Sequence, residues 1–392
     1  MIRIKKHLNV DLLNRLFIGV LVLITSFIFL FKLSSLLGGI SSYEYFISVN
    51  FDNLNKILNN IIYLPYLSVH YISSLFFSNS IFVDRLVSVL FTVPLIYFFY
   101  RFFRKKFGYY TSFFATLLFI TTSLLLHVSR IATPEIMYFS GIYLICYSEY
   151  LRTEKNHFKL LLIGGLLFSV LLYIPGFIYL VLLTIIINRR IFKTLISKNS
   201  KKHRAIIILS MMIILAPLIR GIIINPHNLS ELLWIPSQVP NLFDIIKRII
   251  NVPIYFFVRM FYSPSIWLGR LPILDAFATG MFILGSYRIF RDWYELYNRF
   301  IAYLLLLSIL IFAITNGTLS VILPLVYVII GLGIALSIDK WFFVFPKNPI
   351  ARALGVSILT IAVIASCTYQ TRNYFIAWPN NSITKTFYRL TL

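Results

Sequence analysis

Charged residues are scarce in this chain of 392 residues. Only 12% are Asp, Glu, Lys or Arg, and only 13 residues are acidic, whereas a soluble protein carries about 25% charged residues. This scarcity excludes a soluble globular enzyme and a disordered chain. Cysteine is also scarce, since Cys146 and Cys367 stand alone within apolar runs. That excludes a secreted disulfide scaffold and gives no metal-binding spacing.

What the chain has instead is apolar sequence. Hydrophobic residues make up 59% of it, and the mean hydropathy is +0.85. We therefore expect an all-α integral membrane protein. Its net charge of +23 comes from 36 Lys and Arg. Because cytoplasmic loops are rich in both residues and anionic headgroups attract them, we expect a lipid bilayer as the partner and no nucleic acid.

A membrane-spanning helix needs about 20 mostly apolar residues. Runs of this kind predict eleven spans, and one stretch, 160–187, is long enough for two. Basic residues flank that stretch on both sides, and Tyr173-Ile174-Pro175-Gly176 interrupts it, so we interpret it as a hairpin of two short helices. The spans are expected near 15–32, 83–100, 109–126, 135–151, 160–187 (two), 205–223, 273–290, 300–315, 318–338 and 353–369.

The distribution of charge predicts the orientation. About two thirds of the 36 Lys and Arg fall in the segments that this topology places in the cytoplasm, so we expect a cytoplasmic N-terminus and an external C-terminus. Residues 1–392 then form one polytopic domain. It has two long external loops, 33–82 and 224–272, and a short external tail, 371–392, with no soluble C-terminal domain.

Both long loops contain sequence typical of helices that lie in the membrane interface. Residues 53–62 place apolar side chains at helical spacing with polar ones between them, and residues 242–262 do the same. Long structured loops often carry function.

Ionisable residues gather at the external membrane boundary in three places. They are the segment around Tyr43 and Glu44, the turn 127–135, and the segment 267–275. Carboxylates there can act as a general base or hold a metal, and arginines can clamp a phosphate. Each also has a plainer interpretation. Glu135 after Pro134 suits the start of a helix, and boundary arginines can snorkel to the headgroups.

Several segments together resemble a known superfamily. They follow in order along most of the chain: Asp84–Phe91, Ser129–Glu135, Leu172–Gly176, Trp267–Asp275 and Asn373–Pro379. With the long first external loop, this arrangement resembles the GT-C superfamily of membrane glycosyltransferases. More narrowly, it is similar to the bacterial relatives of dolichyl-phosphate-mannose protein mannosyltransferase and of the lipid A aminoarabinose transferase.

The resemblance implies a reaction and a place for it. Such an enzyme moves a sugar from a polyprenyl-phosphate donor to a protein, lipid or envelope glycan at the external face of the bacterial cytoplasmic membrane. Glu44 would act as general base, and Glu135 would position the acceptor. A divalent metal, if present, would bind these two carboxylates. The residues expected to bind the donor phosphate are Lys56, Arg85, Arg130, Arg259 and Arg270, and those expected to support the acceptor are Tyr43, Asp52, Asp84 and His127.

One departure from the family pattern keeps alternatives open. The first loop usually carries Asp-Glu with the Asp as base, and here the pair is Tyr43-Glu44. Either Glu44 or Asp52 then serves as base, or activity is impaired. A transporter or lipid flippase is the second hypothesis, although no internal repeat is present and the charges gather at one face. A non-catalytic scaffold of the cell envelope is the third.

Overall fold

The computed structural model describes residues 2–50, 57, 60–77, 80–236, 238, 240–260, 270–315 and 317–390, with side chains from Asn14 onward. These residues form helices and connecting segments. Their only β-type pairing is an isolated antiparallel bridge between Ile40 and Leu390, so the all-α prediction is confirmed.

The helices of the first half of the chain are α1 (Ile2–Leu30), α2 (Ser42–Asn50), α4 (Leu64–Phe76), α5 (Ile81–Phe107), α6 (Tyr109–Thr121), α7 (Ser123–Arg130), the 3-10 helix η1 (Pro134–Ser140), α8 (Gly141–Thr153), α9 (His157–Leu171), α10 (Phe177–Ile187) and α11 (Arg189–Lys198). Those of the second half are α12 (Lys201–Ile224), α13 (His227–Leu232), α14 (Leu242–Phe257), α15 (Ala276–Arg291), α16 (Leu296–Thr315), η2 (Leu319–Val321), α17 (Leu323–Val344), α18 (Pro349–Arg372), the π-helix η3 (Asn373–Ala377), α19 (Trp378–Asn380) and α20 (Ser382–Phe387).

Within these residues, five helical segments are long and apolar enough to cross a membrane, or six if the bent pair α6 and α7 counts as one span. Three shorter apolar helices, 14–30, His157–Leu171 and Phe177–Ile187, account for further predicted spans. A helix lies at every predicted span, while the count of eleven and the sidedness of the termini stay predictions. The first helix begins at Ile2, well before the predicted residue 15.

The predicted span 109–126 is broken rather than continuous. Helices α6 and α7 meet at 62°, and Thr122 between them has an extended ψ of 126°. The hydroxyls of Thr121 and Thr122 donate to the carbonyl oxygens of Leu117 and Leu118, so they compete with the backbone hydrogen bonds of the helix. The break turns α7 so that it runs towards the first loop.

The hairpin at 160–187 is confirmed. Helix α9 ends at Leu171, α10 starts at Phe177, and Gly176 between them has a φ of +75°, which suits glycine. Its N–H donates to the carbonyl oxygen of Leu232 at 2.9 Å. The hairpin turn is thereby fixed to the loop that follows α12.

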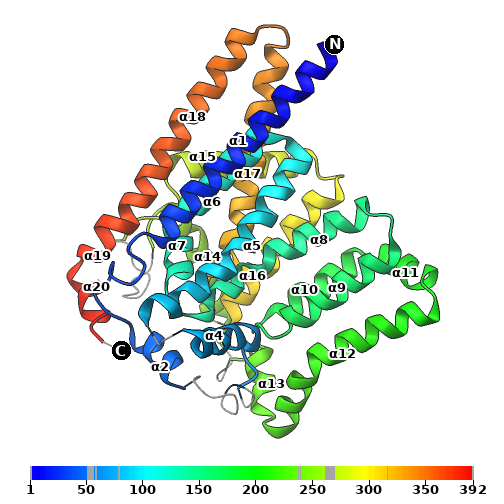
Figure 1. Cartoon of the computed structure of the whole chain (residues 1–392), viewed down its shortest axis with the longest axis vertical. Coiled ribbons are helices and arrows are strands. Elements are labelled where there is room, and N and C mark those ends of the chain that lie inside the picture. Colours follow the sequence, from blue (N-terminus) through cyan, green and yellow to red (C-terminus); the bar gives the residue numbers. More distant parts are fainter. Residues whose placement is uncertain are drawn as a thin grey trace.

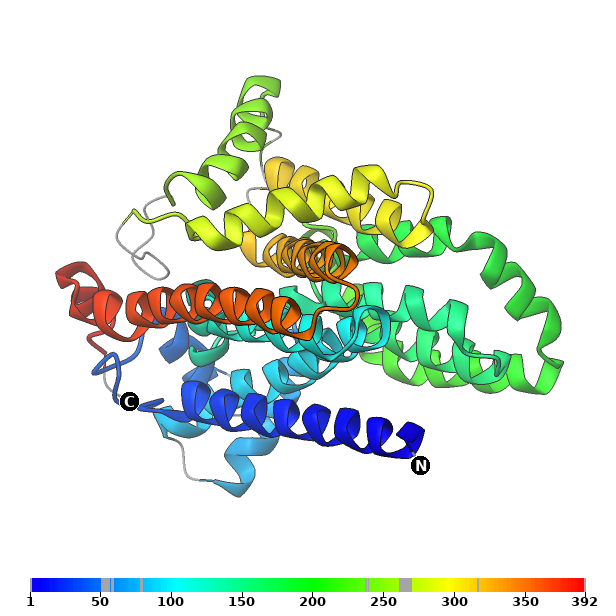
Figure 2. The same cartoon turned by 90° about the horizontal axis from the view of Figure 1, so that it is seen from above.

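Helix α17 forms the centre of the bundle (Figure 1). All of its residues from Leu323 to Leu336 are buried. It packs directly on α15, where a Cβ at Gly285 or Gly333 would collide with backbone of the facing helix. Helix α12 is the opposite case, since only Ile207 and Gly221 are buried. With α9 to α11 it projects from the side of the bundle (Figures 1 and 2).

The two loop helices expected at the interface have different outcomes. Of the first, 53–62, only residues 57 and 60–62 are described. The second forms the helix α14, which ends at Phe257, buries Val252 and Phe256 and exposes Leu242 and Phe243; its place at the membrane interface stays a prediction.

Candidate functional site

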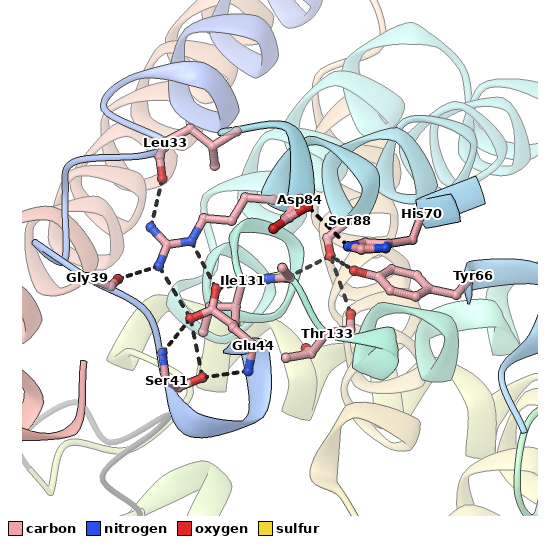
Figure 3. A network of polar contacts seen from close by, with 12 residues as sticks. Leu33, Gly39, Ser41, Glu44, Tyr66, His70, Asp84, Ser88, Ile131 and Thr133 are labelled. Carbon is pink, nitrogen blue, oxygen red and sulfur yellow. Dashed lines mark hydrogen bonds and ion pairs between the residues drawn. The ribbon is translucent and has the colours of Figure 1, made fainter. Parts of the chain in front are cut away.

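The carboxylate of Glu44 lies at the centre of a buried polar network (Figure 3). The residue belongs to the first turn of α2. The Ser41 N–H donates to Glu44 Oε2 at 2.9 Å, and the Glu44 N–H donates to Ser41 Oγ at 3.2 Å. This reciprocal pair is a capping box, which the order Ser-x-x-Glu favours at the start of a helix. It fixes the direction in which α2 leaves the segment that follows α1.

Arg85 of α5 neutralises that carboxylate. Its Nε donates to Glu44 Oε1 at 2.9 Å, and its two terminal nitrogens donate to the carbonyl oxygens of Leu33 and Gly39. The Ala132 N–H also donates to Glu44 Oε1, at 3.1 Å. Arg85 is 1% exposed and Glu44 2%. A carboxylate has about four lone-pair positions, so Glu44 has none left for the proton of an acceptor.

Arg130, at the end of α7, has a similar environment. Its guanidinium donates to the carbonyl oxygens of Ile28 and Phe31 and lies 4.8 Å from the centre of the Phe375 ring. The last carbonyls of a helix lack partners within it, so Arg130 caps α1, and Arg85 holds the segment that follows α1. Both arginines are buried. Their placement does not support the predicted phosphate-binding role, because both guanidinium groups are buried and their terminal nitrogens donate to backbone oxygens.

Two further predicted residues are also buried in packing contacts. Asp84 of α5 lies 3.2 Å from His70 of α4, a contact that joins these two helices. His127 is fully buried against the ring of Trp378, with ring centres 3.7 Å apart. Within the described residues neither ring nitrogen of His127 has a hydrogen-bond partner. The structure thus places Asp84 and His127 among supporting contacts and away from the cavities described below.

The segment 131–135 connects the buried network to Glu135. Ser88 of α5 bonds with the carbonyl oxygens of Ile131 and Thr133, and Glu44 holds the Ala132 N–H between them (Figure 3). Three consecutive residues are therefore fixed by side chains from α2 and α5. The next two, Pro134 and Glu135, open η1. The network thereby sets where Glu135 lies without touching it.

Glu135 itself lines a cavity of about 210 Å³. The hydroxyls of Thr318 and Ser320 both donate to its Oε1, the latter at 2.8 Å. In the described part of the chain, Oε2 receives no hydrogen bond and no cation pairs with this carboxylate. The lining residues are Leu124, Glu135, Met260, Gly317, Thr318, Leu319 and Ser320. Among the described residues, Glu135 therefore keeps an oxygen without a partner, which a ligand could use, whereas Glu44 does not.

The predicted cations of the second loop flank a residue pair that reaches this cavity. Met260 lines the cavity, and its N–H donates to the carbonyl oxygen of Leu271 at 3.3 Å. Arg259 precedes Met260, Arg270 precedes Leu271, and both arginines are exposed. Neither arginine lines the cavity itself, and Lys56 and Asp52 lie outside the described residues.

A second cavity, of about 170 Å³, is lined in part by Pro134, the neighbour of Glu135. Its polar side chains include Tyr43 and Tyr63, and the Tyr63 hydroxyl lies 2.6 Å from that of Tyr138. Burial first, and then the negative charge of Glu135, raise the pKa of the Tyr43 phenol. The residues that line it are Tyr43, Phe46, Ile47, Asn60, Ile62, Tyr63, Leu67, Pro134 and Glu231.

Several of these residues escaped the sequence interpretation. Thr318 and Ser320 sit just before α17 in a segment with no charge, and Tyr63 is one of 25 tyrosines. Glu231 stood in the second loop without a motif. Only the Ser41-x-x-Glu44 spacing could have been found from the sequence. This spacing predicts a cap at the start of a helix rather than a general base. In the described residues no group of three or more His, Cys, Asp or Glu could hold a metal.

Comparison with known proteins agrees with this architecture. Residues 64–220 match the family model of dolichyl-phosphate-mannose-protein mannosyltransferase. The fold is similar to the crystal structure of ArnT from Cupriavidus metallidurans in the apo state, with a TM-score of 0.56 and 11% sequence identity over 94% of this chain and 76% of that one. No curated protein matches by sequence. The predicted resemblance to membrane glycosyltransferases of this kind is confirmed: the family model carries it over residues 64–220, and the similarity to ArnT is one of fold.

Proposed function

We propose that the chain transfers a sugar from a polyprenyl-phosphate donor to an acceptor hydroxyl at the external face of a bacterial cytoplasmic membrane. The observation that carries this is the cavity at Glu135, where a carboxylate with one oxygen that no described residue bonds lies beside two hydroxyls, and where the lining residue Met260 follows the exposed Arg259. A carboxylate and cations close together are what transfer from a phosphate leaving group requires.

Glu135 takes the role of general base in this proposal. It accepts the proton of the acceptor hydroxyl while that oxygen bonds to the anomeric carbon of the sugar. The bond from this carbon to the phosphate oxygen breaks, and the polyprenyl phosphate leaves as an anion. Arg259 and Arg270 stabilise its growing charge. The acceptor, the sugar and any divalent metal bound with Glu135 stay predictions.

Glu44 becomes a positioning residue rather than the base. Its carboxylate oxygens accept hydrogen bonds from Ser41, Arg85 and Ala132 and have no free position. It acts on the reaction through the 131–135 segment, which it holds by the Ala132 N–H. Tyr43, in the usual Asp position, lines the second cavity and supplies a protonated phenol to a bound sugar.

The test is sugar transfer by purified protein from radiolabelled polyprenyl-phosphate sugars to membrane extract. We expect Glu135→Gln to lower kcat by two to four orders of magnitude, about the contribution of a general base, with the thermal unfolding midpoint close to wild type. Glu154→Gln, at a half-buried residue that lines neither cavity, is the control. Transfer that survives Glu135→Gln at full rate excludes this base. Absence of transfer with every donor, by a folded wild type, excludes the activity.

A further inference from the structure

A strongly basic corner lies away from the site, where α9, α11 and the start of α12 project from the bundle (Figure 1). Within 155–230 the chain has no Asp or Glu. Eight of the nine cations at the corner are exposed, and Arg204 is half-buried. We call this set the basic corner: Lys155, Lys159, Arg189, Arg190, Lys193, Lys198, Lys201, Lys202 and Arg204.

The segments that carry these cations are packed together. Helix α9 contacts both α11 and α12, and the rings of Phe158 and His203 lie 4.6 Å apart. The cations before α9, on α11 and at the start of α12 therefore belong to one surface.

Helix α11 holds its part of that surface in a fixed orientation. Leu195 is buried against the bundle, and the Phe192 ring lies 6.1 Å from that of Phe168. At the start of α11 the buried Asn188 accepts hydrogen bonds from Arg152 and Ser148. With this apolar stripe turned inward, the alternation of the sequence leaves Arg190 and Lys193 on the exposed side.

The charge of this corner is not neutralised by the protein. Elsewhere, basic side chains at helix ends have acidic partners: Lys106 lies 2.9 Å from Glu149, and Arg288 lies 3.1 Å from Asp339. None of the nine cations forms an ion pair with an acidic side chain in the described residues. The nearest carboxylate, Glu154, is engaged by backbone N–H groups and by Tyr150.

Apolar surface borders the cations directly. Ile196 on α11 is 48% exposed, and Ile206 and Ile208 on α12 are more than half exposed. This pairing of exposed positive charge with exposed aliphatic side chains fits a lipid, whose phosphate meets the cations while its acyl chains cover the isoleucines. A soluble polyanion would leave the isoleucines in water.

We propose that the basic corner binds the headgroups of anionic phospholipids and thereby fastens the α9–α12 unit to the bundle through the membrane. Helix α12 buries so few of its own side chains that its position depends on the lipid around it. This inference does not depend on the reaction proposed for Glu135.

The test uses the full chain in nanodiscs of phosphatidylcholine, alone or with a third of the lipid replaced by phosphatidylglycerol. Native mass spectrometry counts the phosphatidylglycerol retained, and thermal unfolding gives the midpoint in each lipid. The variant Arg190→Gln/Lys193→Gln removes two charges from the basic corner. The matched control, Lys340→Gln/Lys347→Gln, removes two exposed cations at the α17–α18 turn.

We expect wild type and control to retain phosphatidylglycerol and to unfold at a higher temperature when it is present. The basic-corner variant should lose about fivefold in lipid affinity per charge removed at low salt. Equal losses in both variants would mean that positive charge acts diffusely, and the site would not exist. Two further results would overturn the proposal. One is that the basic-corner variant retains as much phosphatidylglycerol as wild type. The other is that this variant loses binding to an acidic peptide while it still binds the lipid.

Discussion

The Glu44–Arg85 pair allows a sharp test of whether Glu44 is a base or a positioning residue. Glu44→Gln leaves the guanidinium of Arg85 buried without its counter-charge, since Arg85 is 1% exposed. Breaking a buried ion pair from one side costs about 3–5 kcal/mol. We therefore expect a large fall in stability and, because the 131–135 segment loosens, a fall in sugar transfer as well.

The double variant separates the two roles. Glu44→Gln with Arg85→Met removes both charges, and the Gln carbonyl can still accept from the Ala132 N–H. Two carbonyl oxygens, those of Leu33 and Gly39, then lose their donor, at about 1–3 kcal/mol each. The double variant should be less destabilised than the sum of the two single ones, with a coupling energy of about 3 kcal/mol.

The assays are denaturant unfolding in detergent for all four proteins and sugar transfer at a temperature where each is folded. A positioning role predicts that the double variant regains part of the transfer that Glu44→Gln loses. If Glu44 donates or accepts the proton itself, no change at Arg85 can restore transfer. A double variant that is stable but inactive would refute our interpretation of this pair.

Three further predictions concern packing and pH. Gly39→Ala should loosen the C-terminal segment and raise its protease sensitivity, because a Cβ there lies 2.7 Å from the carbonyl oxygens of Tyr388 and Leu390. The control is Gly19→Ala, whose Cβ would meet nothing within 4 Å. Equal protease sensitivity of the two variants would contradict the prediction. Gly333→Leu should prevent α15 and α17 from packing and abolish a monodisperse peak in size-exclusion chromatography, whereas Gly280→Ala should not. Burial, and then the charge of Glu44, raise the pKa of Tyr388. As pH rises above about 10, the unfolded chain loses this proton before the folded protein does, so the free energy of unfolding should fall. Tyr388→Phe should make the free energy of unfolding less dependent on pH in this range.

The sequence predicted the helices better than the contacts between them. Apolar length alone located α9 and α10, and Pro175-Gly176 located their turn. The break at Thr122 was missed because its cause lies in hydroxyls that bond back to α6 and in Gln370 of α18, which accepts from the Ser123 N–H at 3.2 Å. Hydropathy does not register such contacts between distant segments.

The candidate site shows the same limit. Arg85, Arg130, Arg259 and Arg270 look alike in sequence, and only the fold separates the two that bond to backbone oxygens of the α1 region from the two that stay exposed. Glu44 looked like a free carboxylate because its partner lies on another helix. A carboxylate paired across the fold cannot be told from an unpaired one by its neighbours in the chain.

The bridge between Ile40 and Leu390 also bears on how the protein is made. The Ile40 N–H donates to the Leu390 carbonyl oxygen at 2.9 Å, so the loop that follows α1 pairs with a segment that is synthesised long after it. This pairing cannot form until the helices α4 to α18, which lie between the two segments in the chain, have been made. The loop therefore closes late in biogenesis, on helices that are synthesised before its partner segment.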